Sequence, residues 1–245
     1  RGICPNIIRA WNVCSMVACL EEDKVPFYES LTSSVVRFVP QPVPDFMVRG
    51  AFRAGPELKD EWLLTYGDNN PTNYIVAVGV ARRLKLPLRL TAVSREVCDF
   101  IKDYLGVAVY YPVHLNDKGQ QEDKIVALPQ DMYMKNFMSR SKVCLHTSRW
   151  VGTSRMSITG ACCGTAVIGW NESHTQKRLF PDLAVDLYDI DKICILVRKL
   201  YKDYEFYKMI ADKAFKNTEF YSEENALQRM IDAIREVQFR RIRNG

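Results

Sequence analysis

Two arginines near the middle of the chain, Arg149 and Arg155, flank a polar segment that contains Gly152, Thr153 and Ser154. The guanidinium group presents planar, forked donors that match phosphate and carboxylate oxygens. Glycine carries no Cβ, so a ligand can come close to its backbone. These residues predict an anion site. Surface ion pairing is the alternative role of the arginines, and a tight turn is the alternative role of Gly152.

The elements around this segment place it at the start of a helix. Residues 143–145 form an apolar run with β propensity, residues 154–163 are typical of a helix, and residues 166–168 predict a second strand. Gly164 suits the helix C-terminus, where a left-handed residue is common. Such a unit directs the N–H groups of residues 152–155 beyond the carboxyl end of the strand. An anion is stabilised there by about 0.3–1 kcal/mol.

The rest of the chain predicts alternating strands and helices. The expected strands are residues 62–66, 86–93, 107–111, 124–128 and 183–187. The expected helices are residues 72–84, 94–104, 130–140, 190–201 and 204–217, with a last helix from Ser222 to about residue 239. This alternation predicts an α/β fold, a Rossmann-like parallel sheet with helices on both faces.

Sheets of this kind bind ligands beyond the carboxyl ends of their strands. The loops expected there carry short polar groups, glycine or arginine, and they supply most of the candidate ligand-binding residues. These are Gly67, Asp68, Asn69, Asn70, Ser94, Arg95, Leu128, Arg149, Gly152, Thr153, Ser154 and Arg155. Residues 68–70 also suit a plain turn, and Ser94 also suits a helix N-cap. No GxGxxG or GxxxxGK[ST] motif occurs, so the sequence supports neither a dinucleotide site nor an ATPase.

Composition and charge narrow the class of protein. The chain has 245 residues, 47% of them hydrophobic and 26% charged, as in ordinary soluble proteins. No apolar run of membrane-spanning length and no signal-peptide pattern occurs, which predicts a cytoplasmic location. The cysteines show no CxxC spacing, which predicts free thiols in a reducing compartment and no metal site. His146 follows an apolar run and is expected to be a structural histidine.

The two ends of the chain are expected to lie outside the central domain. Residues 3–22 predict one helix, and the Pro-rich residues 35–45 predict a stiff linker. The predicted domains are residues 1–45, residues 46–222 and residues 223–245. Arg240, Arg241 and Arg243 give the tail a basic end, which fits either a solvated helix terminus or a patch for acidic lipid or nucleic acid. A peripheral association with a membrane surface is one such role.

The segment 142–169, KVCLHTSRWVGTSRMSITGACCGTAVIG, resembles a stretch of the retaining GT-B glycosyltransferases. That stretch is written as a strand, E-G-x-G and E-A-x-A-C-G-T-P-V-I. Within residues 35–239, VVRFVPQPVPD is similar to the family's interdomain segment, LLTYGD to its first donor-domain strand, and LAVDLYDIDKICILVRKLYKDYEFYKMIADKA to its C-terminal helices. The resemblance implies a nucleotide-sugar donor, such as a UDP- or GDP-sugar, bound without a metal or other cofactor. It also implies a reduced or incomplete N-terminal acceptor part.

Several positions depart from the family pattern. The glutamate that holds the donor ribose falls at Thr159, whose hydroxyl is a candidate replacement, and the other glutamate falls at Val151. The basic residues after the first donor-domain strand fall near Asp68 and Asn70, and Ala166 replaces the proline. Arg149 or Arg155 is the candidate source of the missing charge.

These features lead to one expected function with two alternatives. The expected function is that of a hexosyltransferase-like glycosyltransferase, which transfers a sugar from a nucleotide sugar to a saccharide, lipid-linked or protein acceptor. The first alternative is a non-catalytic nucleotide or nucleotide-sugar binding module that has lost the family glutamates. The second is a DNA-modifying glucosyltransferase, suggested only by the basic balance of charge.

Overall fold

The protein was analysed as a computed structural model, which describes residues 5–66, 74–91, 94–110, 114–115, 121–122, 130–148 and 154–244. The chain forms two compact units. One unit contains residues 1–48 together with residues 219–245, and the other contains residues 49–218. The domain boundaries predicted from the sequence, after residues 45 and 222, put the two ends of the chain in separate domains. In the structure both ends contribute to the same unit.

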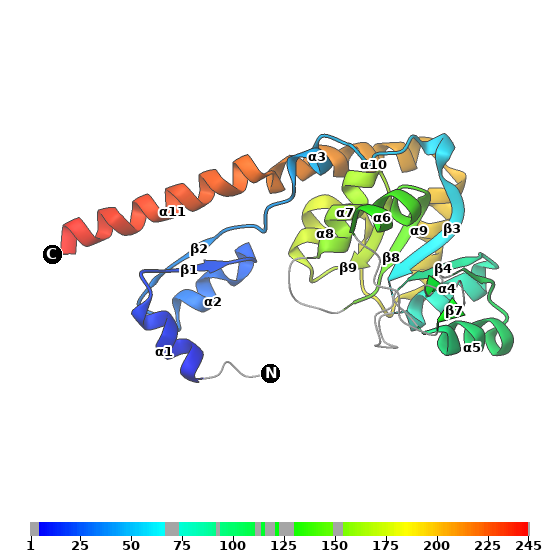
Figure 1. Cartoon of the computed structure of the whole chain (residues 1–245), viewed down its shortest axis with the longest axis horizontal. Coiled ribbons are helices and arrows are strands. Elements are labelled where there is room, and N and C mark those ends of the chain that lie inside the picture. The colour runs from blue at the N-terminus through cyan, green and yellow to red at the C-terminus, as the bar shows by residue number, and fades with distance from the viewer. Residues whose placement is uncertain are drawn as a thin grey trace. The chain divides into compact units, whose positions relative to one another are not determined.

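The larger unit is built on a six-stranded sheet in the order β10-β9-β8-β3-β4-β5, and every neighbouring pair is parallel (Figure 1). The predicted Rossmann-like parallel sheet is therefore confirmed. The strands are β3 (Asp60–Tyr66), β4 (Leu88–Thr91), β5 (Val109–Tyr110), β8 (Ser141–His146), β9 (Ala166–Trp170) and β10 (Ala184–Val185). A small antiparallel pair, β6 (His114–Leu115) and β7 (Gln121–Glu122), lies outside this sheet.

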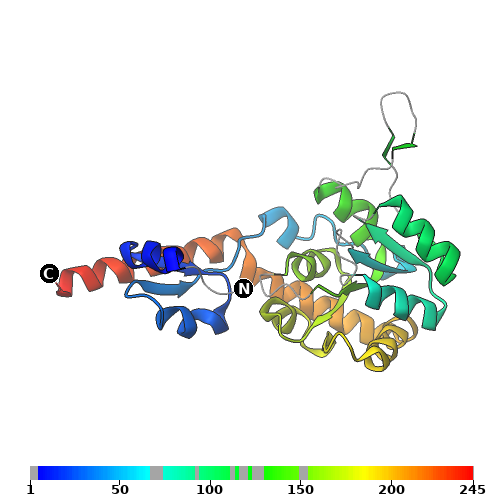
Figure 2. The same ribbon diagram turned by 90° about the horizontal axis from the view of Figure 1, so that it is seen from below.

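Helices flank the sheet (Figure 2). They are α4 (Ile75–Leu84), α5 (Arg95–Leu105), α6 (Gln130–Tyr133), α7 (Arg155–Cys163), α8 (His174–Leu179), α9 (Ile190–Lys202) and α10 (Tyr204–Asn217). A π-helical turn, Met134–Met138, continues α6, and short 3-10 turns occupy Pro56–Leu58 and Pro181–Leu183. Gly164 follows α7 with φ +69°, so the predicted left-handed end of this helix is confirmed.

The core of the larger unit lies between these helices and the central strands. Leu63 and Leu64 of β3 are fully buried, and so are Leu88 and Leu90 of β4. Neighbouring residues of a strand point to opposite faces, so burial of both Leu63 and Leu64 means that helices cover both faces of the sheet. This accounts for the continuous apolar runs in the sequence. The predicted strand at residues 124–128 lies outside the described residues.

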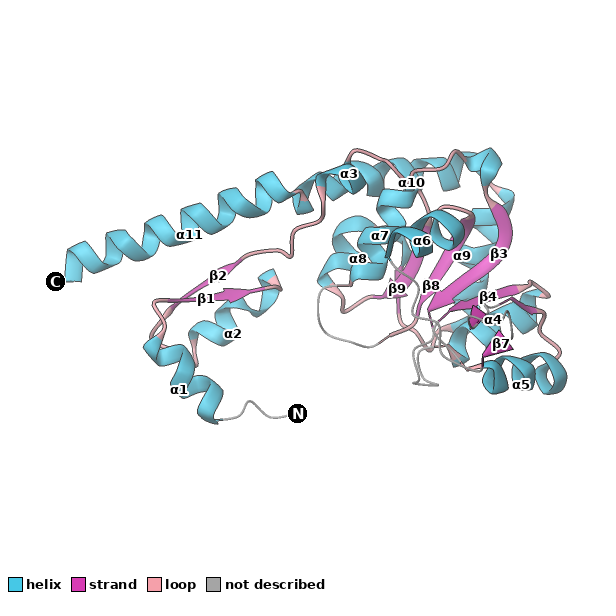
Figure 3. Ribbon diagram, viewed as in Figure 1, coloured by secondary structure: helices cyan, strands magenta, loops and turns pink. Residues whose placement is uncertain are grey.

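The smaller unit contains a two-stranded parallel sheet, β1 (Met16–Cys19) and β2 (Val35–Phe38), shown in magenta in Figure 3. Its helices are α1 (Pro5–Val13), α2 (Val25–Glu29), α3 (Asp45–Val48) and α11 (Glu223–Asn244). Short 3-10 turns occupy Glu22–Lys24 and Thr218–Tyr221.

The expectation of a single helix over residues 3–22 is wrong. The helix ends at Val13, and Met16–Cys19 pairs with a strand that lies far away in the sequence. That pairing outweighs the local helical pattern. The Pro-rich segment also departs from a plain linker, because it begins as strand β2. Glu236 of α11 holds Arg37 of β2 through a two-pronged ion pair, which fixes the last helix on this sheet.

Among the helices in the described ranges, none has both the length and the apolar character needed to cross a bilayer.

Candidate functional site

The order of the strands defines a position for a ligand-binding crevice at the carboxyl ends of the central strands. β3 lies between β4 and β8, so the chain leaves β3 toward one side of the sheet and returns through β8 on the other. Open α/β sheets bind ligands at this reversal, beyond the carboxyl ends of the strands. Thr65 marks this end of β3, and its buried hydroxyl donates to the Leu145 carbonyl of β8 over 2.9 Å.

Only some of the predicted site residues lie within the described residues. Ser94, Arg95, Ser154, Arg155 and Thr159 belong to the described residues. The remaining candidates, Gly67, Asp68, Asn69, Asn70, Leu128, Arg149, Gly152 and Thr153, lie outside them. The candidates just after β4 and β8 therefore define the geometry of the site.

The start of α7 has the features of an anion site. Ser154 is the N-cap residue, and its hydroxyl oxygen accepts a hydrogen bond from the Ser157 N–H over 3.3 Å. Arg155 is the first helical residue and its side chain is exposed. The first turn carries no acidic residue. The helix dipole and the Arg155 charge therefore act in the same direction on a negative group placed before the helix.

A buried polar network attaches this helix start to β8, α8 and β9. His146 ends β8, and its Nδ1 lies 3.0 Å from Ser154 Oγ. Ser154 Oγ lies 2.9 Å from Ser157 Oγ, and Ser157 Oγ donates to Gln176 Oε1 over 2.7 Å. Gln176 Nε2 donates to the Val167 carbonyl over 2.7 Å. Nδ1 of His146 therefore has the hydrogen-bond partner expected of a structural histidine.

Removal of the imidazole from water lowers the pKa of His146 from 6.5 to about 4. Between pH 6.5 and pH 4 the unfolded chain therefore binds more protons than the folded chain at this residue, and the free energy of unfolding falls as the pH falls. The His146→Asn variant keeps an N–H donor near Ser154 and does not titrate. We expect it to lose less stability over this window than the wild type, by at most about 3 kcal/mol. Urea unfolding at both pH values measures the difference, and equal losses would contradict it.

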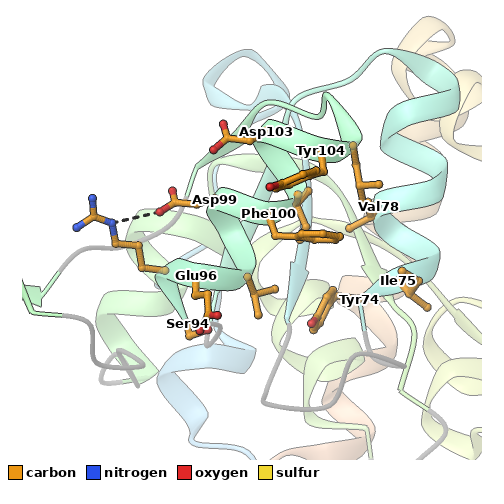
Figure 4. Close-up of a pocket in the computed structure, with 13 residues that line it drawn as sticks. Tyr74, Ile75, Val78, Ser94, Glu96, Asp99, Phe100, Asp103 and Tyr104 are labelled. Atoms are coloured by element: carbon orange, nitrogen blue, oxygen red, sulfur yellow. Dashed lines mark hydrogen bonds and ion pairs between the residues drawn. The ribbon is translucent and has the colours of Figure 1, made fainter.

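A cavity of about 960 Å³ lies between α4 and α5 (Figure 4). Tyr74 and Ser94 lie at one end of it, and Phe100 forms part of its apolar wall. Ser94 occupies the N-cap position of α5, as predicted, but its side chain makes no capping hydrogen bond. Arg95 Nε lies 3.3 Å from Asp99 Oδ2.

This cavity brings together only part of the predicted site. Ser94 and Arg95 line it, whereas Ser154, Arg155 and Thr159 do not. Thr159 lies in α7 and is only 6% exposed. The start of α7 and the cavity are therefore two distinct features of the larger unit. The sequence analysis did not find the wall of this cavity. Phe100 and Tyr104 line it, and their spacing of one helical turn, which places both on one face of α5, could have indicated an apolar wall.

Sequence reasoning also missed Lys59, a partly buried cation with a structural role. Its Nζ donates to the Ser139 carbonyl over 2.8 Å and to the Cys163 carbonyl over 3.0 Å. Cys163 ends α7, so Lys59 lies at the opposite end of this helix from Ser154. Lys59 therefore stabilises the C-terminal end of α7 and is not one of the ligand-binding candidates.

Within the described ranges, no three His, Cys, Asp or Glu residues are grouped so as to hold a metal ion. The cysteines in these ranges are free thiols, as predicted from their spacing. These are Cys14, Cys19, Cys98, Cys144, Cys162, Cys163 and Cys194. Burial raises the pKa of the Cys163 thiol to about 12, which keeps it protonated and unreactive.

Comparison of the fold with solved structures identifies its class. A mutant of S. aureus TarM, crystallised with fondaparinux, α-GlcNAc-glycerol and UDP, is similar with a TM-score of 0.70, 15% identity, and coverage of 93% of this chain and 45% of TarM. A sucrose-phosphate synthase from Thermosynechococcus elongatus has a TM-score of 0.70 and 15% identity, and the match covers 94% of this chain and 60% of the synthase. HepE from Anabaena, in complex with UDP and glucose, has a TM-score of 0.71 and 9% identity, and the match covers 94% of this chain and 66% of HepE.

These likenesses show that the chain has the GT-B glycosyltransferase fold, as its resemblance implies. The chain spans less than two thirds of the length of the first of these solved structures, TarM and sucrose-phosphate synthase. No protein-family model matches the sequence, and no curated protein matches it.

Proposed function

We propose that this protein binds a nucleotide sugar and transfers its sugar as a glycosyltransferase. One observation carries the proposal: the capped start of α7, with Arg155 as its first residue, follows β8 beside the reversal of the strand order. The diphosphate of a nucleotide sugar has the charge that this position favours. UDP is named with two of the similar solved structures, TarM and HepE, so a UDP-sugar is the first donor to test.

The chemistry assigned to the site is stabilisation of the leaving diphosphate. Negative charge develops on the diphosphate as the bond to the sugar breaks. Fixed N–H groups and a guanidinium stabilise that charge without reorganising during the step. Arg155 would supply the charge, and the first turn of α7 would supply the N–H donors. The resemblance implies that no metal is needed for this role, and that a saccharide, lipid-linked or protein acceptor receives the sugar.

A non-catalytic binding module is the second candidate. Thr159 stands at the position of the family's ribose-binding glutamate, and the missing carboxylate favours this reading. Both candidates bind the nucleotide sugar, and only the first turns it over. Release of UDP from UDP-glucose with added acceptor sugars separates them.

Substitution of Arg155 by alanine tests the anion site. We expect the dissociation constant for UDP to rise about tenfold to a hundredfold, because a hydrogen bond to a charged group contributes roughly 1.5–3 kcal/mol. Isothermal titration calorimetry with UDP and UDP-glucose provides the measurement. Arg235→Ala, which removes an exposed arginine from α11, is the matched control and should leave the affinity unchanged. Equal affinities for the wild type and Arg155→Ala would reject the site.

A further inference from the structure

The direction of each hydrogen bond in the buried network can be derived from Gln176. This side chain is fully buried. Its amide lies 2.7 Å from the Val167 carbonyl and 3.3 Å from the Leu183 carbonyl, and both carbonyls can only accept. The NH₂ group must therefore face these carbonyls, and Oε1 must face Ser157. The Ser157 hydroxyl then donates its single proton to Oε1 over 2.7 Å.

The remaining directions follow because a hydroxyl has only one proton. Ser157 has used its proton, so the 2.9 Å bond between the two serines takes its proton from Ser154. Ser154 Oγ is then an acceptor for its other two contacts. It accepts from the Ser157 N–H over 3.3 Å and from His146 Nδ1 over 3.0 Å. Nδ1 of His146 must therefore carry a proton.

The other ring nitrogen of His146 is left with a lone pair. The lowered pKa of this imidazole keeps it neutral at pH 7, so a proton on Nδ1 means none on Nε2. The geometry of the ring directs Nε2 away from Ser154. No described residue makes a hydrogen bond to Nε2, and His146 ends β8 at the ligand-binding edge of the sheet.

We propose that His146 is a specificity-determining residue whose unprotonated Nε2 accepts a hydrogen bond from a hydroxyl group of the bound nucleotide sugar. The proposal rests on the proposed function, because it assigns one contact at the same site. A phosphate has no proton to offer at neutral pH, so the lone pair of Nε2 opposes it. The ribose and the sugar both offer hydroxyl donors. His146 would thus distinguish the sugar-bearing parts of the ligand from the diphosphate, which belongs at Arg155.

The tautomer can be measured directly by long-range proton–nitrogen NMR of the ¹⁵N-labelled protein at pH 7. The three histidines are distinguished by the signals that disappear in His146→Asn. We expect the wild type to show a protonated Nδ1 and a bare Nε2 at His146. In Ser157→Ala the Ser154 hydroxyl loses its acceptor and becomes free to donate to Nδ1, so the proton should move to Nε2. A bare Nδ1 in the wild type would overturn the derivation.

Ser222→Ala provides a matched control for the serine substitution. Ser222 is a buried N-cap serine of α11, in the smaller unit, and its hydroxyl accepts from the Asn225 N–H over 3.2 Å. Its loss should leave the His146 signals unchanged. A change of tautomer in this variant would show that the network does not fix the proton, and would count against the proposal.

Binding measurements test the contact with the hydroxyl group. His146→Asn keeps a donor for Ser154 but loses the acceptor at Nε2. We expect about tenfold weaker binding of UDP-glucose and unchanged binding of inorganic pyrophosphate. Weaker binding of UDP as well would assign the contact to the ribose, and a loss confined to UDP-glucose would assign it to the glucose. Unchanged UDP-glucose affinity, with weakened binding in Arg155→Ala, would overturn the contact and leave the proposed function standing. If the wild type binds no nucleotide, both fall, and the tautomer is still decided by NMR.

Discussion

Replacement of Lys59 by methionine is expected to lower the free energy of unfolding by about 2–4 kcal/mol. Nζ of Lys59 donates to the Ser139 and Cys163 carbonyls, which belong to the last turns of two helices and lack helical partners. Methionine fills a similar volume but offers no donor. Each buried acceptor left without a partner costs about 1–3 kcal/mol, and the removed desolvation of the ammonium offsets part of that cost. Urea unfolding at pH 7 measures the loss.

The dependence on pH gives this variant a second signature. Burial lowers the pKa of Lys59 from 10.5 to about 8, so between these pH values the unfolded chain binds more protons than the folded chain. The wild-type free energy of unfolding should therefore gain from this residue as the pH rises from 8 to 10.5, by at most about 3 kcal/mol. The raised pKa of buried Tyr207 acts in the opposite direction above about pH 10, equally in both proteins.

The stability difference between the wild type and Lys59→Met should accordingly widen with pH. Lys213→Met is the matched control, because Lys213 is half exposed and pairs with Asp182 at the surface. We expect that substitution to cost less than about 1 kcal/mol and to leave the pH profile unchanged. A constant difference between the wild type and Lys59→Met across the window would mean that Lys59 does not titrate near pH 8.

The parallel sheet and α7 could be predicted because their signals are local. The apolar run of β8, the helix from Ser154 and the turn at Gly164 follow each other within one strand–helix–strand unit. Each element is specified by its own residues, and the alternation of elements then favours a parallel sheet. The N-cap bond of Ser154 is also local, since its side chain bonds to a backbone group only three residues away, but this role was not among the predictions.

The features that escaped prediction depend on residues that lie far apart in the sequence. β1 becomes a strand because it pairs with β2, and the Lys59 ammonium is held by the carbonyls of Ser139 and Cys163. The bond between Ser157 and Gln176 likewise joins two helices. Local periodicity contains no information about such contacts, so the sequence alone does not show that Gln176 is fully buried or that Lys59 donates to backbone carbonyls.

Replacement of Gly160 by valine is expected to destabilise the larger unit by about 3 kcal/mol and to disturb the site at the same time. Gly160 lies in α7 where the helix packs on β9. A Cβ atom there would overlap Val167 Cγ2 and lie 3.3 Å from the Thr165 carbonyl. The carbonyl belongs to the backbone and cannot rotate away, so a branched side chain forces the helix and the strand apart. Overpacking of this kind costs about 1–3 kcal/mol, occasionally more.

Gly79→Ala is the control for the helical propensity of glycine. Gly79 lies in α4, and a Cβ atom there would meet nothing within 4 Å. Alanine should therefore stabilise α4, by up to about 1 kcal/mol, because it restricts the unfolded chain and favours the helix. Urea unfolding of both variants separates the two effects. Destabilisation by both substitutions to the same extent would contradict a specific contact between Gly160 and β9.

The effect of Gly160→Val should also reach ligand binding. The same helix carries Ser154 and Arg155 at its start, and Ser157 ties it to Gln176 of α8 over 2.7 Å. A helix moved away from β9 cannot keep both this short bond to Gln176 and the 3.0 Å contact between Ser154 Oγ and His146 Nδ1 of β8. We therefore expect the folded Gly160→Val protein to bind UDP about tenfold more weakly, while Gly79→Ala binds it as the wild type does. Unchanged UDP affinity in folded Gly160→Val would separate the packing of α7 on β9 from the anion site at its start.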